Sequence, residues 1–270
     1  MDSAHASASV PYDLLLVGGG NMGSALLGGL LESGSVDASA VAVAELDADR
    51  RVDLARRFPG VTVTAELPMC RGAVLAVKPD GAAAVAAAAV TAGATRLLSI
   101  AAGVRLDTLT AAAGDGAAVL RAMPNTPALV RRGTTALCGA AGVTEHDFAW
   151  AERVLGAVGI VERLPESLFD LFTGLAGSGP AYLFLVAEAL TEVAVAEGLE
   201  PDRAERIVGE LLVGSSLLLA REGDPATLRA KVTSPGGTTA AGVAVLEDRD
   251  LRGTVIAAVR AAAGRSRELG

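Results

Sequence analysis

The sequence predicts a domain with a doubly wound, parallel α/β sheet, followed by an all-helical domain. Up to about residue 163, short runs of Val and Leu alternate with helical stretches, at a spacing typical of right-handed crossovers between parallel strands. Beyond that point, apolar residues recur at helical spacing and no strand is expected. We therefore expect a disordered tail over residues 1–12, an α/β domain over 13–163 and a helical domain over 164–270.

The elements of the α/β part follow one another in a regular order. The expected strands are DLLLVGG, AVAVAEL, VTVT, AVLAVKP, RLLSIAAG and AAVLRAMPN. The expected helices between them include NMGSALLGGLLESG, DADRRVDLARRF and the Ala-rich tract 82–92. Ala is the best helix former, so this tract is predicted to be an ordered crossover helix and not a disordered segment.

Three helices are expected early in the second domain. Residues 180–197 have apolar residues at helical spacing, and Gly198 ends that helix. Pro201 opens a second helix that runs to about Arg221, and Asp224-Pro225 opens a third. The stretch ELLVGSSLLLA in the second helix is apolar on nearly every side, which predicts burial between helices or against a second subunit.

Composition and charge exclude several classes of protein. Of the 270 residues, 51% are hydrophobic, enough to bury a large core. The formal net charge is -8 and there is no run of Lys or Arg, so no nucleic-acid partner is expected. The first ten residues lack the features of a signal peptide. Neither of the longest uncharged runs, Gly81 to Thr95 and Leu171 to Ala187, makes a convincing membrane span, so no membrane partner is expected.

Cysteine and histidine usage narrows the class further. Cys70 and Cys138 are too few for a disulfide framework, and both have small or apolar neighbours. They are expected to be free, buried thiols in a reducing compartment, which favours a cytoplasmic protein. The two histidines, His5 in the tail and His146 at a polar helix start, lie in no plausible site, and no metal site is predicted.

The stretch VGGGNMGSAL carries the first site motif. Gly18, Gly20 and Gly23 fit G-x-G-x-x-G between an expected strand and an expected helix, with Asn21 and Met22 inside the motif. The first Gly permits a tight turn, the second lets a pyrophosphate approach the backbone, and the third lets the helix pack on the strand. The helix N-terminus then faces the phosphates, so a bound dinucleotide is expected.

Glu45 ends the second expected strand, where an acidic side chain can accept hydrogen bonds from the adenosine ribose hydroxyls. That position favours NAD and would repel a 2′-phosphate. Arg50 and Arg51 follow on the next helix and could reach a 2′-phosphate, although a solvated surface position is the simpler role for both. The choice between NADH and NADPH therefore stays open at this point.

Two further strand ends and one turn are candidates for contact with the cofactor. Ligands of open α/β sheets lie at the carboxyl ends of the strands, although an ordinary loop would look the same in the sequence. Asn125 lies in the stiff turn RAMPNTPALV and could contact the cofactor or merely cap its own turn. The candidate residues at the strand ends are Val77, Lys78, Pro79, Ala101, Ala102 and Gly103.

A polar turn, SPGGTT, precedes the expected helix AAGVAVLE in the second domain. At such a helix entry, free backbone N–H groups and the positive end of the helix dipole can hold a small carboxylate without a basic side chain. Plain capping by Ser or Thr is the alternative, and it needs only one hydroxyl. The candidate anion-binding residues are Ser234, Gly236, Gly237, Thr238 and Thr239.

Taken together and in this order, these motifs resemble one enzyme family. GGGNMGSALLGGL, AVKP, SIAAGV, RAMPNTPALV, GLAGSGPAY and VTSPGGTTAAGVAVLE look like pyrroline-5-carboxylate reductase, the NAD(P)H-dependent enzyme that makes L-proline. The resemblance runs from about Asp13 to Leu269, and RAMPNTPA and SPGGTT are its most specific parts. It implies an N-terminal Rossmann domain and a C-terminal helical domain that interlocks with a second subunit as a homodimer, with dimers often assembling into decamers.

The resemblance also implies a reaction and its site residues. Hydride passes from the reduced nicotinamide, of NADPH or NADH, to the C=N carbon of 1-pyrroline-5-carboxylate, and binding and alignment supply most of the catalysis. The backbone around Ser234, Gly236 and Gly237 would hold the substrate carboxylate, and Thr239 would place its hydroxyl near the ring nitrogen. Glu166 matches a family position close to the substrate, although it could be an ordinary surface carboxylate.

Two departures from the family pattern keep other functions open. Ala230 stands where many relatives carry an acidic residue, and Glu45 stands where many have a small or neutral one. The alternatives are a related imine reductase with a different cyclic substrate, or an NAD(P)H-binding protein without turnover.

Overall fold

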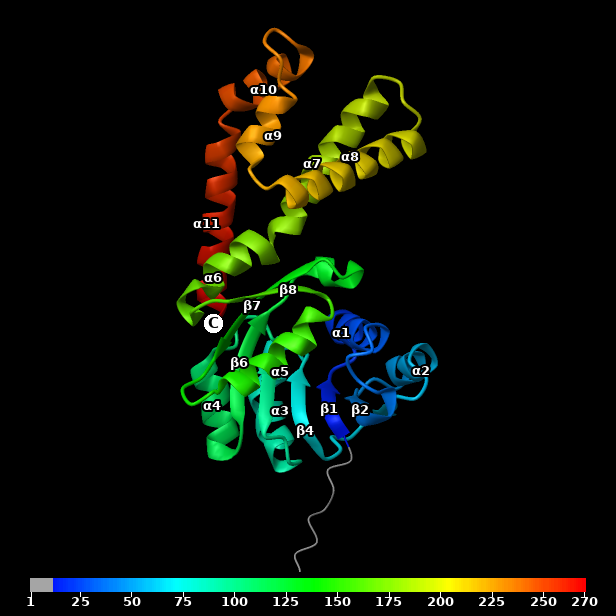
Figure 1. Cartoon of the computed structure of the whole chain (residues 1–270), viewed down its shortest axis with the longest axis vertical. Coiled ribbons are helices and arrows are strands. Elements are labelled where there is room, and N and C mark those ends of the chain that lie inside the picture. Colours follow the sequence, from blue (N-terminus) through cyan, green and yellow to red (C-terminus); the bar gives the residue numbers. More distant parts are fainter. Residues whose placement is uncertain (1–11) are drawn as a thin grey trace, which may run out of the picture. The chain divides into compact units, whose positions relative to one another are not determined.

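The structure, a computed structural model, describes residues 12–270 and consists of two compact units (Figure 1). The first unit runs up to Gly177 and also includes Ala263–Gly270, and the second is Ser178–Ala262. The boundary therefore falls later than the expected division at 163/164, and the last residues of the chain return to the first unit. Of the expected tail, residues 1–11 lie outside the described residues, and Tyr12 already belongs to the first strand.

The first unit is built on one eight-stranded sheet in the order β3-β2-β1-β4-β5-β6-β7-β8. Neighbouring strands are parallel except for β6 and β7, which are antiparallel. Because β1 lies between β2 and β4, the strand order reverses there, which places a ligand crevice at the carboxyl ends of these strands. The strands are β1 (Tyr12–Val17), β2 (Val41–Ala44), β3 (Thr62–Thr64), β4 (Cys70–Leu75), β5 (Arg96–Ser99), β6 (Ala118–Met123), β7 (Gly133–Gly139) and β8 (Gly159–Arg163).

Helices cover both faces of this sheet, and the alternation within β1 shows why. Leu14 and Leu16 pack in a core cluster with side chains of α1, α2 and α5, whereas Leu15 and Val17 pack in a second cluster with α3 and α4. Both sides of the strand are apolar because both are covered. The helices are α1 (Asn21–Glu32), α2 (Ala48–Arg57), α3 (Pro79–Thr91), α4 (Leu106–Ala113) and α5 (Glu145–Gly156).

The doubly wound α/β prediction is confirmed, and all six expected strands are present. The Ala-rich tract is an ordered helix, and Ala82, Ala86 and Ala89 are fully buried against the sheet. The last two strands, β7 and β8, were not expected. Two Gly and two Thr in β7 weaken its apolar run. Its partners are β6, the preceding strand, and β8, which follows only after α5.

The second unit contains helices but no strand within its described residues, as expected. Its helices are α7 (Gly179–Ala196), α8 (Pro201–Glu222), α9 (Pro225–Lys231), α10 (Thr238–Asp248) and most of α11 (Leu251–Leu269), and the short α6 (Phe169–Phe172) precedes it in the first unit. α7 and α8 pack against each other, yet within the described chain α7 has no buried residue, and Ala204 and Val208 are the buried residues of α8.

Apolar side chains are therefore exposed along α7 and α8. The continuous helical stretch Glu166–Ala196 contains an 18-residue window with a mean hydropathy of 1.4, so it is long and apolar enough to cross a membrane by length and composition. Those two criteria do not separate a membrane helix from one that is covered by another protein surface. The exposed apolar residues of the two helices include Leu183, Phe184, Leu185, Val186, Ile207, Leu211, Val213, Leu217 and Leu218.

Candidate active site

The Gly-rich loop joins β1 to α1 with the geometry that its sequence predicts. Gly18 has a φ of +102°, and a Cβ there would lie 2.5 Å from the carbonyl oxygen of Ala76 in the loop after β4. Gly23 is buried in the first turn of α1, where a Cβ would overlap the carbonyl oxygen of Gly18. A Cβ on Gly20 would meet open space, so a ligand can approach the backbone there. The three glycines thus lie as a dinucleotide loop requires.

The N-terminus of α1 is free to receive an anion. Its N-cap residue is Gly20, which has no side chain with which to cap the first amides, and its first turn, Asn21 to Ser24, contains no acidic residue. Asn21 is exposed and Met22 half-buried, while Ser24 turns back to donate a hydrogen bond to the carbonyl of Gly19 at 2.9 Å. A cavity of about 410 Å³ adjoins this loop on the side of Arg50. These features fit a bound pyrophosphate.

Glu45 follows β2 and lies against the Gly-rich loop, with only 8% of its surface exposed. Its Oε2 accepts hydrogen bonds from the Gly19 amide at 2.9 Å and from the Arg50 guanidinium at 3.2 Å, and its Oε1 accepts from the Asp47 amide at 3.0 Å. Burial alone would raise the pKa of this carboxyl, but the two amides and Arg50 together hold the pKa below its usual value. Glu45 is therefore a fixed carboxylate at the expected ribose position.

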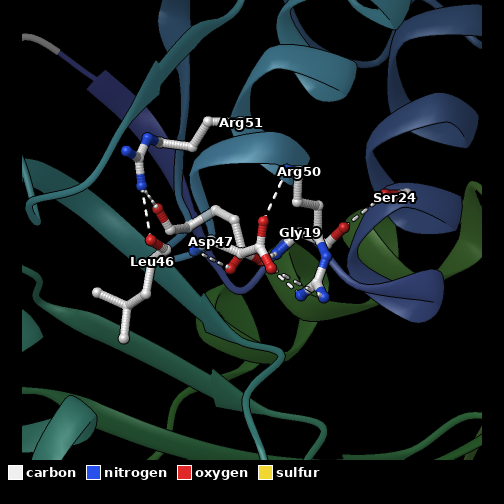
Figure 2. Close-up of polar contacts among 7 residues, drawn as sticks. Gly19, Ser24, Leu46, Asp47, Arg50 and Arg51 are labelled. Atoms are coloured by element: carbon white, nitrogen blue, oxygen red, sulfur yellow. Dashed lines mark hydrogen bonds and ion pairs between the residues drawn. The ribbon is translucent and has the colours of Figure 1, made fainter.

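Arg50 and Arg51, the two arginines in the first turn of α2, bind different atoms. Arg51 donates from one guanidinium nitrogen to the carbonyl oxygens of Glu45 at 2.9 Å and Leu46 at 2.7 Å, so it holds the loop after β2. Arg50 lies beside the Glu45 carboxylate, and its backbone amide donates to Asp47, the N-cap residue of α2. Figure 2 shows the two side chains directed to these separate partners.

The expected strand-end residues lie at the same edge of the sheet. Lys78 is the N-cap residue of α3 and is exposed, as is Pro79, whereas Val77 is half-buried. After β5, Ala101 is buried, Ala102 is exposed, and Gly103 turns the chain with a φ of +79°.

The end of α11 also lies at this edge, which the sequence did not indicate. A Cβ on Gly103 would lie 3.3 Å from the carbonyl oxygen of Leu269. The Ser266 hydroxyl donates to the Asp170 carboxylate at 2.7 Å, which ties the same end of α11 to α6. The last residues of the chain therefore support the loop after β5.

Asn125 is buried and holds two segments together. Its Nδ2 donates to the carbonyl of Ala176 at 3.0 Å, and its Oδ1 accepts from the Thr134 amide at 2.9 Å. One amide proton of its side chain is left for another acceptor. Its expected contact with the cofactor stays a prediction.

Glu166 is half-buried and takes part in a hydrogen-bond network with β6 and the start of α4. Its Oε1 accepts from the Arg121 guanidinium at 2.6 Å and from the amide of Leu106, the first residue of α4, at 2.8 Å. Arg121 is buried and stacks over the ring of Phe169, 4.8 Å from its centroid. Leu106 follows Gly103 by only three residues, so Glu166 fixes one end of that loop. Its expected contact with substrate is likewise a prediction.

The two thiols are buried and free, as expected. Burial raises the pKa of Cys138 to about 12, with a further contribution from the Glu166 charge, and burial raises the pKa of Cys70 to about 11. Both are therefore protonated at neutral pH and poor nucleophiles.

The SPGGTT turn leads directly into α10. Gly236 has a φ of +69°, and the Gly237 amide donates to the Ser234 carbonyl at 3.0 Å. Gly237 is the N-cap residue of α10 and has no side chain for capping. The amides of Thr238 and Thr239, at the start of the helix, therefore receive no hydrogen bond from an N-cap side chain. A Cβ on Gly237 would lie 2.5 Å from the Ser234 hydroxyl. All of these residues except the half-buried Gly237 are exposed, and Ala230 is exposed near the end of α9.

Two family models match the chain. A model described as pyrroline-5-carboxylate reductase dimerisation matches residues 166–269, and one described as NADP oxidoreductase, coenzyme F420-dependent, matches residues 14–103. The first model covers all of the second unit, and the second covers the Gly-rich loop and the strand ends up to Gly103. Dinucleotide binding and oligomer formation are thus features of the families that the two parts of the chain match.

Relatives and solved structures resemble the chain over almost its whole length. A pyrroline-5-carboxylate reductase from Synechocystis sp. is 40% identical to this chain, and the match covers 94% of this chain and 97% of the relative. One from Mycobacterium leprae is 38% identical, and the match covers 95% of this chain and 96% of the relative. The structure of a pyrroline-5-carboxylate reductase from Coxiella burnetii has a TM-score of 0.89 at 33% identity, covering 96% of this chain and 99% of that one. The structure of the Plasmodium falciparum pyrroline carboxylate reductase, with NADP bound, has a TM-score of 0.83 at 27% identity. The match covers 97% of this chain and 99% of that one. The chain belongs to the pyrroline-5-carboxylate reductase family.

Proposed function

We propose that this chain reduces 1-pyrroline-5-carboxylate to L-proline with NADH or NADPH. The observation that carries the proposal is the N-terminus of α10, which follows the SPGGTT turn and has no N-cap side chain on its first amides. The same chain has a Gly-rich dinucleotide loop whose helix, α1, likewise lacks an N-cap side chain. One helix N-terminus suits a pyrophosphate and the other a small carboxylate. A cyclic imine that carries a carboxylate is a substrate of this kind.

The bound dinucleotide would supply the hydride that reduces the C=N carbon. The chain's own residues bind and orient: Gly20 and the first turn of α1 hold the pyrophosphate, and the amides of Thr238 and Thr239 hold the substrate carboxylate. The ring nitrogen can arrive protonated, so no side chain has to deliver a proton before hydride transfer. The Thr239 hydroxyl is proposed to hydrogen-bond the ring nitrogen and set the face of the ring.

Glu166 is proposed to act through the loop that it fixes. Its Oε1 already accepts from Arg121 and Leu106, so this oxygen is used to hold the start of α4 and the loop at Gly103. We therefore assign it a positioning role near the substrate in place of proton transfer.

We also propose that a second copy of the chain covers the exposed apolar residues of α7 and α8. These helices fall within the part that matches a dimerisation model, and exposed apolar faces of this extent are stabilised by burial. The homodimer would be the unit of a larger assembly, such as a decamer, in the cytoplasm, without nucleic acid or membrane as a partner.

The test is a direct assay with purified protein, 1-pyrroline-5-carboxylate and each reduced cofactor. We expect loss of absorbance at the reduced nicotinamide band together with formation of proline, and complementation of a proline auxotroph. Rapid turnover of other cyclic imines, with poor activity on the pyrroline carboxylate, would instead identify a related imine reductase and implicate Ala230. Tight cofactor binding without any product would identify a non-catalytic binding protein.

A further inference from the structure

We propose that Glu45 makes this chain selective for NADH, and that Arg50 can bind a 2′-phosphate only when the Glu45 charge is removed. This inference rests on the proposed function only in that it needs a dinucleotide at the Gly-rich loop. Residue types alone leave the choice of cofactor open, since one acidic and two basic side chains lie near the expected ribose position.

The Glu45 carboxylate cannot easily move away from the ribose position. It follows β2 at the point where the strand order reverses, and the Gly19 amide donates to it from inside the Gly-rich loop. A Cβ on Gly19 would overlap the Leu54 side chain and lie 3.4 Å from Glu45 Oε2, so the carboxylate and the loop are in close contact. The Asp47 amide holds its other oxygen. A cofactor bound on this loop would place its adenosine ribose beside Glu45.

The two cofactors would interact with this carboxylate in opposite ways. A ribose 2′-hydroxyl of NADH is a donor, and Oε1 of Glu45, which accepts one hydrogen bond, from the Asp47 amide, has a further lone pair to accept another. A 2′-phosphate of NADPH is an acceptor with negative charge, placed next to a carboxylate that its neighbours keep ionised. Repulsion between like charges close together in a partly buried site is large.

The arginines do not compensate for this repulsion as the chain stands. Arg51 donates to the backbone carbonyls of Glu45 and Leu46, so it serves the loop (Figure 2). The Arg50 charge is shared by Glu45 at 3.2 Å and Asp47 at 4.0 Å. About half of the Arg50 side chain, 48%, is exposed, so it can reach a ligand once Glu45 no longer holds it. Removal of the Glu45 charge would therefore both end the repulsion and free a phosphate ligand.

Binding of cofactor fragments tests this without any turnover. Isothermal titration of the full chain would use ADP-ribose and its 2′-phosphorylated form, at constant ionic strength. We expect the wild-type chain to bind ADP-ribose at least about tenfold more tightly, since one lost or repulsive polar contact corresponds to a factor of this order. Equal affinity, or tighter binding of the phosphorylated form, would overturn the proposal, whether or not any variant folds.

Three variants assign the effect to residues. Glu45→Gln keeps the shape and removes the charge, and it should reduce the preference at least about tenfold. Adding Arg50→Ala to it should abolish the gain in affinity for the phosphorylated form. Arg56→Ala is the matched control, because Arg56 is an exposed arginine of the same helix, paired with Asp53, and should leave the preference unchanged. If Glu45→Gln folds and keeps the wild-type preference, Glu45 is not the determinant.

The ratio of kcat/KM with NADH and NADPH then separates this inference from the proposed function. Selective fragment binding without imine turnover would refute the proposed reaction and support the role of Glu45. Turnover at equal efficiency with both cofactors would support the reaction and refute the role of Glu45. Failure of folded protein to bind either fragment would refute both.

Discussion

Replacing Gly23 with Ala is expected to destabilise the α/β unit, although the same change would favour an isolated helix. Ala is better than Gly in a helix interior by about 1 kcal/mol. Against this, a Cβ on Gly23 would overlap the carbonyl oxygen of Gly18 and lie 3.4 Å from the Cβ of Ala76. The carbonyl oxygen of Gly18 belongs to the backbone and the Cβ of Ala76 is fixed to it, so neither can turn aside and α1 would have to move. Overpacking of this kind costs about 1–3 kcal/mol, which leaves a net loss of up to about 2 kcal/mol.

Gly28→Ala is the matched control in the same helix. A Cβ on Gly28 would meet the Phe58 ring at 3.6 Å, an ordinary van der Waals contact. This variant should keep the gain in helix propensity and be up to about 1 kcal/mol more stable than the wild type. Because the propensity gain is common to both variants, the difference between them, about 1–3 kcal/mol, measures the clash at Gly23.

Urea unfolding followed by tryptophan fluorescence measures this difference. Trp150 is the single tryptophan of the sequence, and it is buried in the same core cluster as Leu26 and Leu27 of α1. Its signal therefore reports on the unit that carries the substitutions. Equal midpoints and equal slopes for Gly23→Ala and Gly28→Ala would show that α1 does not approach the Gly-rich loop closely, and the argument from the third glycine would fail.

Three further predictions concern the remaining site residues. Thr239→Ala should lower kcat/KM about tenfold or more through the loss of one hydrogen bond worth roughly 1.5 kcal/mol, and an unchanged value in steady-state kinetics would remove Thr239 from the mechanism. Glu166→Ala should lower the free energy of unfolding, measured in urea, by about 3–5 kcal/mol because it leaves Arg121 buried without its partner. Glu166→Gln keeps a hydrogen-bond acceptor, so the pH profile of kcat should be unchanged if Glu166 only positions the loop. A change in that profile would instead assign proton transfer to Glu166. Cys138, with a pKa raised to about 12, should resist thiol reagents near neutral pH until the protein unfolds, and rapid labelling of the folded chain would contradict its burial.

The sequence could predict those features whose signal lies within a few residues. The spacing of apolar residues predicted six strands and three of the helices between them, α1, α2 and α3. The motif at Gly18, Gly20 and Gly23 predicted a loop in which the structure shows close approaches at Gly18 and Gly23 and open space at Gly20. Parallel strands end at one edge of a sheet, so the meeting of Glu45 with the loop could be expected in outline. The pattern did not indicate that the Gly19 amide donates to the carboxylate.

Contacts between distant segments could not be predicted in the same way. The Glu166 carboxylate meets Arg121 and Leu106 only because β6 lies beside β5 and because the chain returns after β8. Asn125 bridges Ala176 and Thr134 for a similar reason, since β7 turns back against β6. The return of α11 to Gly103 depends on tertiary packing that a helical pattern does not encode.

The two proposed anion sites also explain how a chain with a net charge of -8 can bind anionic ligands. Neither the Gly-rich loop, Gly18 to Gly23, nor the turn Ser234 to Thr239 contains a Lys or Arg. The N-cap residue of each helix is a Gly, which has no side chain to occupy the first amides. Backbone amides do not titrate, so binding of pyrophosphate and carboxylate there should vary little with pH around neutrality. We therefore expect Glu45 to discriminate between cofactors at the ribose without weakening the hold on the pyrophosphate, because Glu45 lies on the loop after β2 and the amides that face the pyrophosphate lie on the loop after β1.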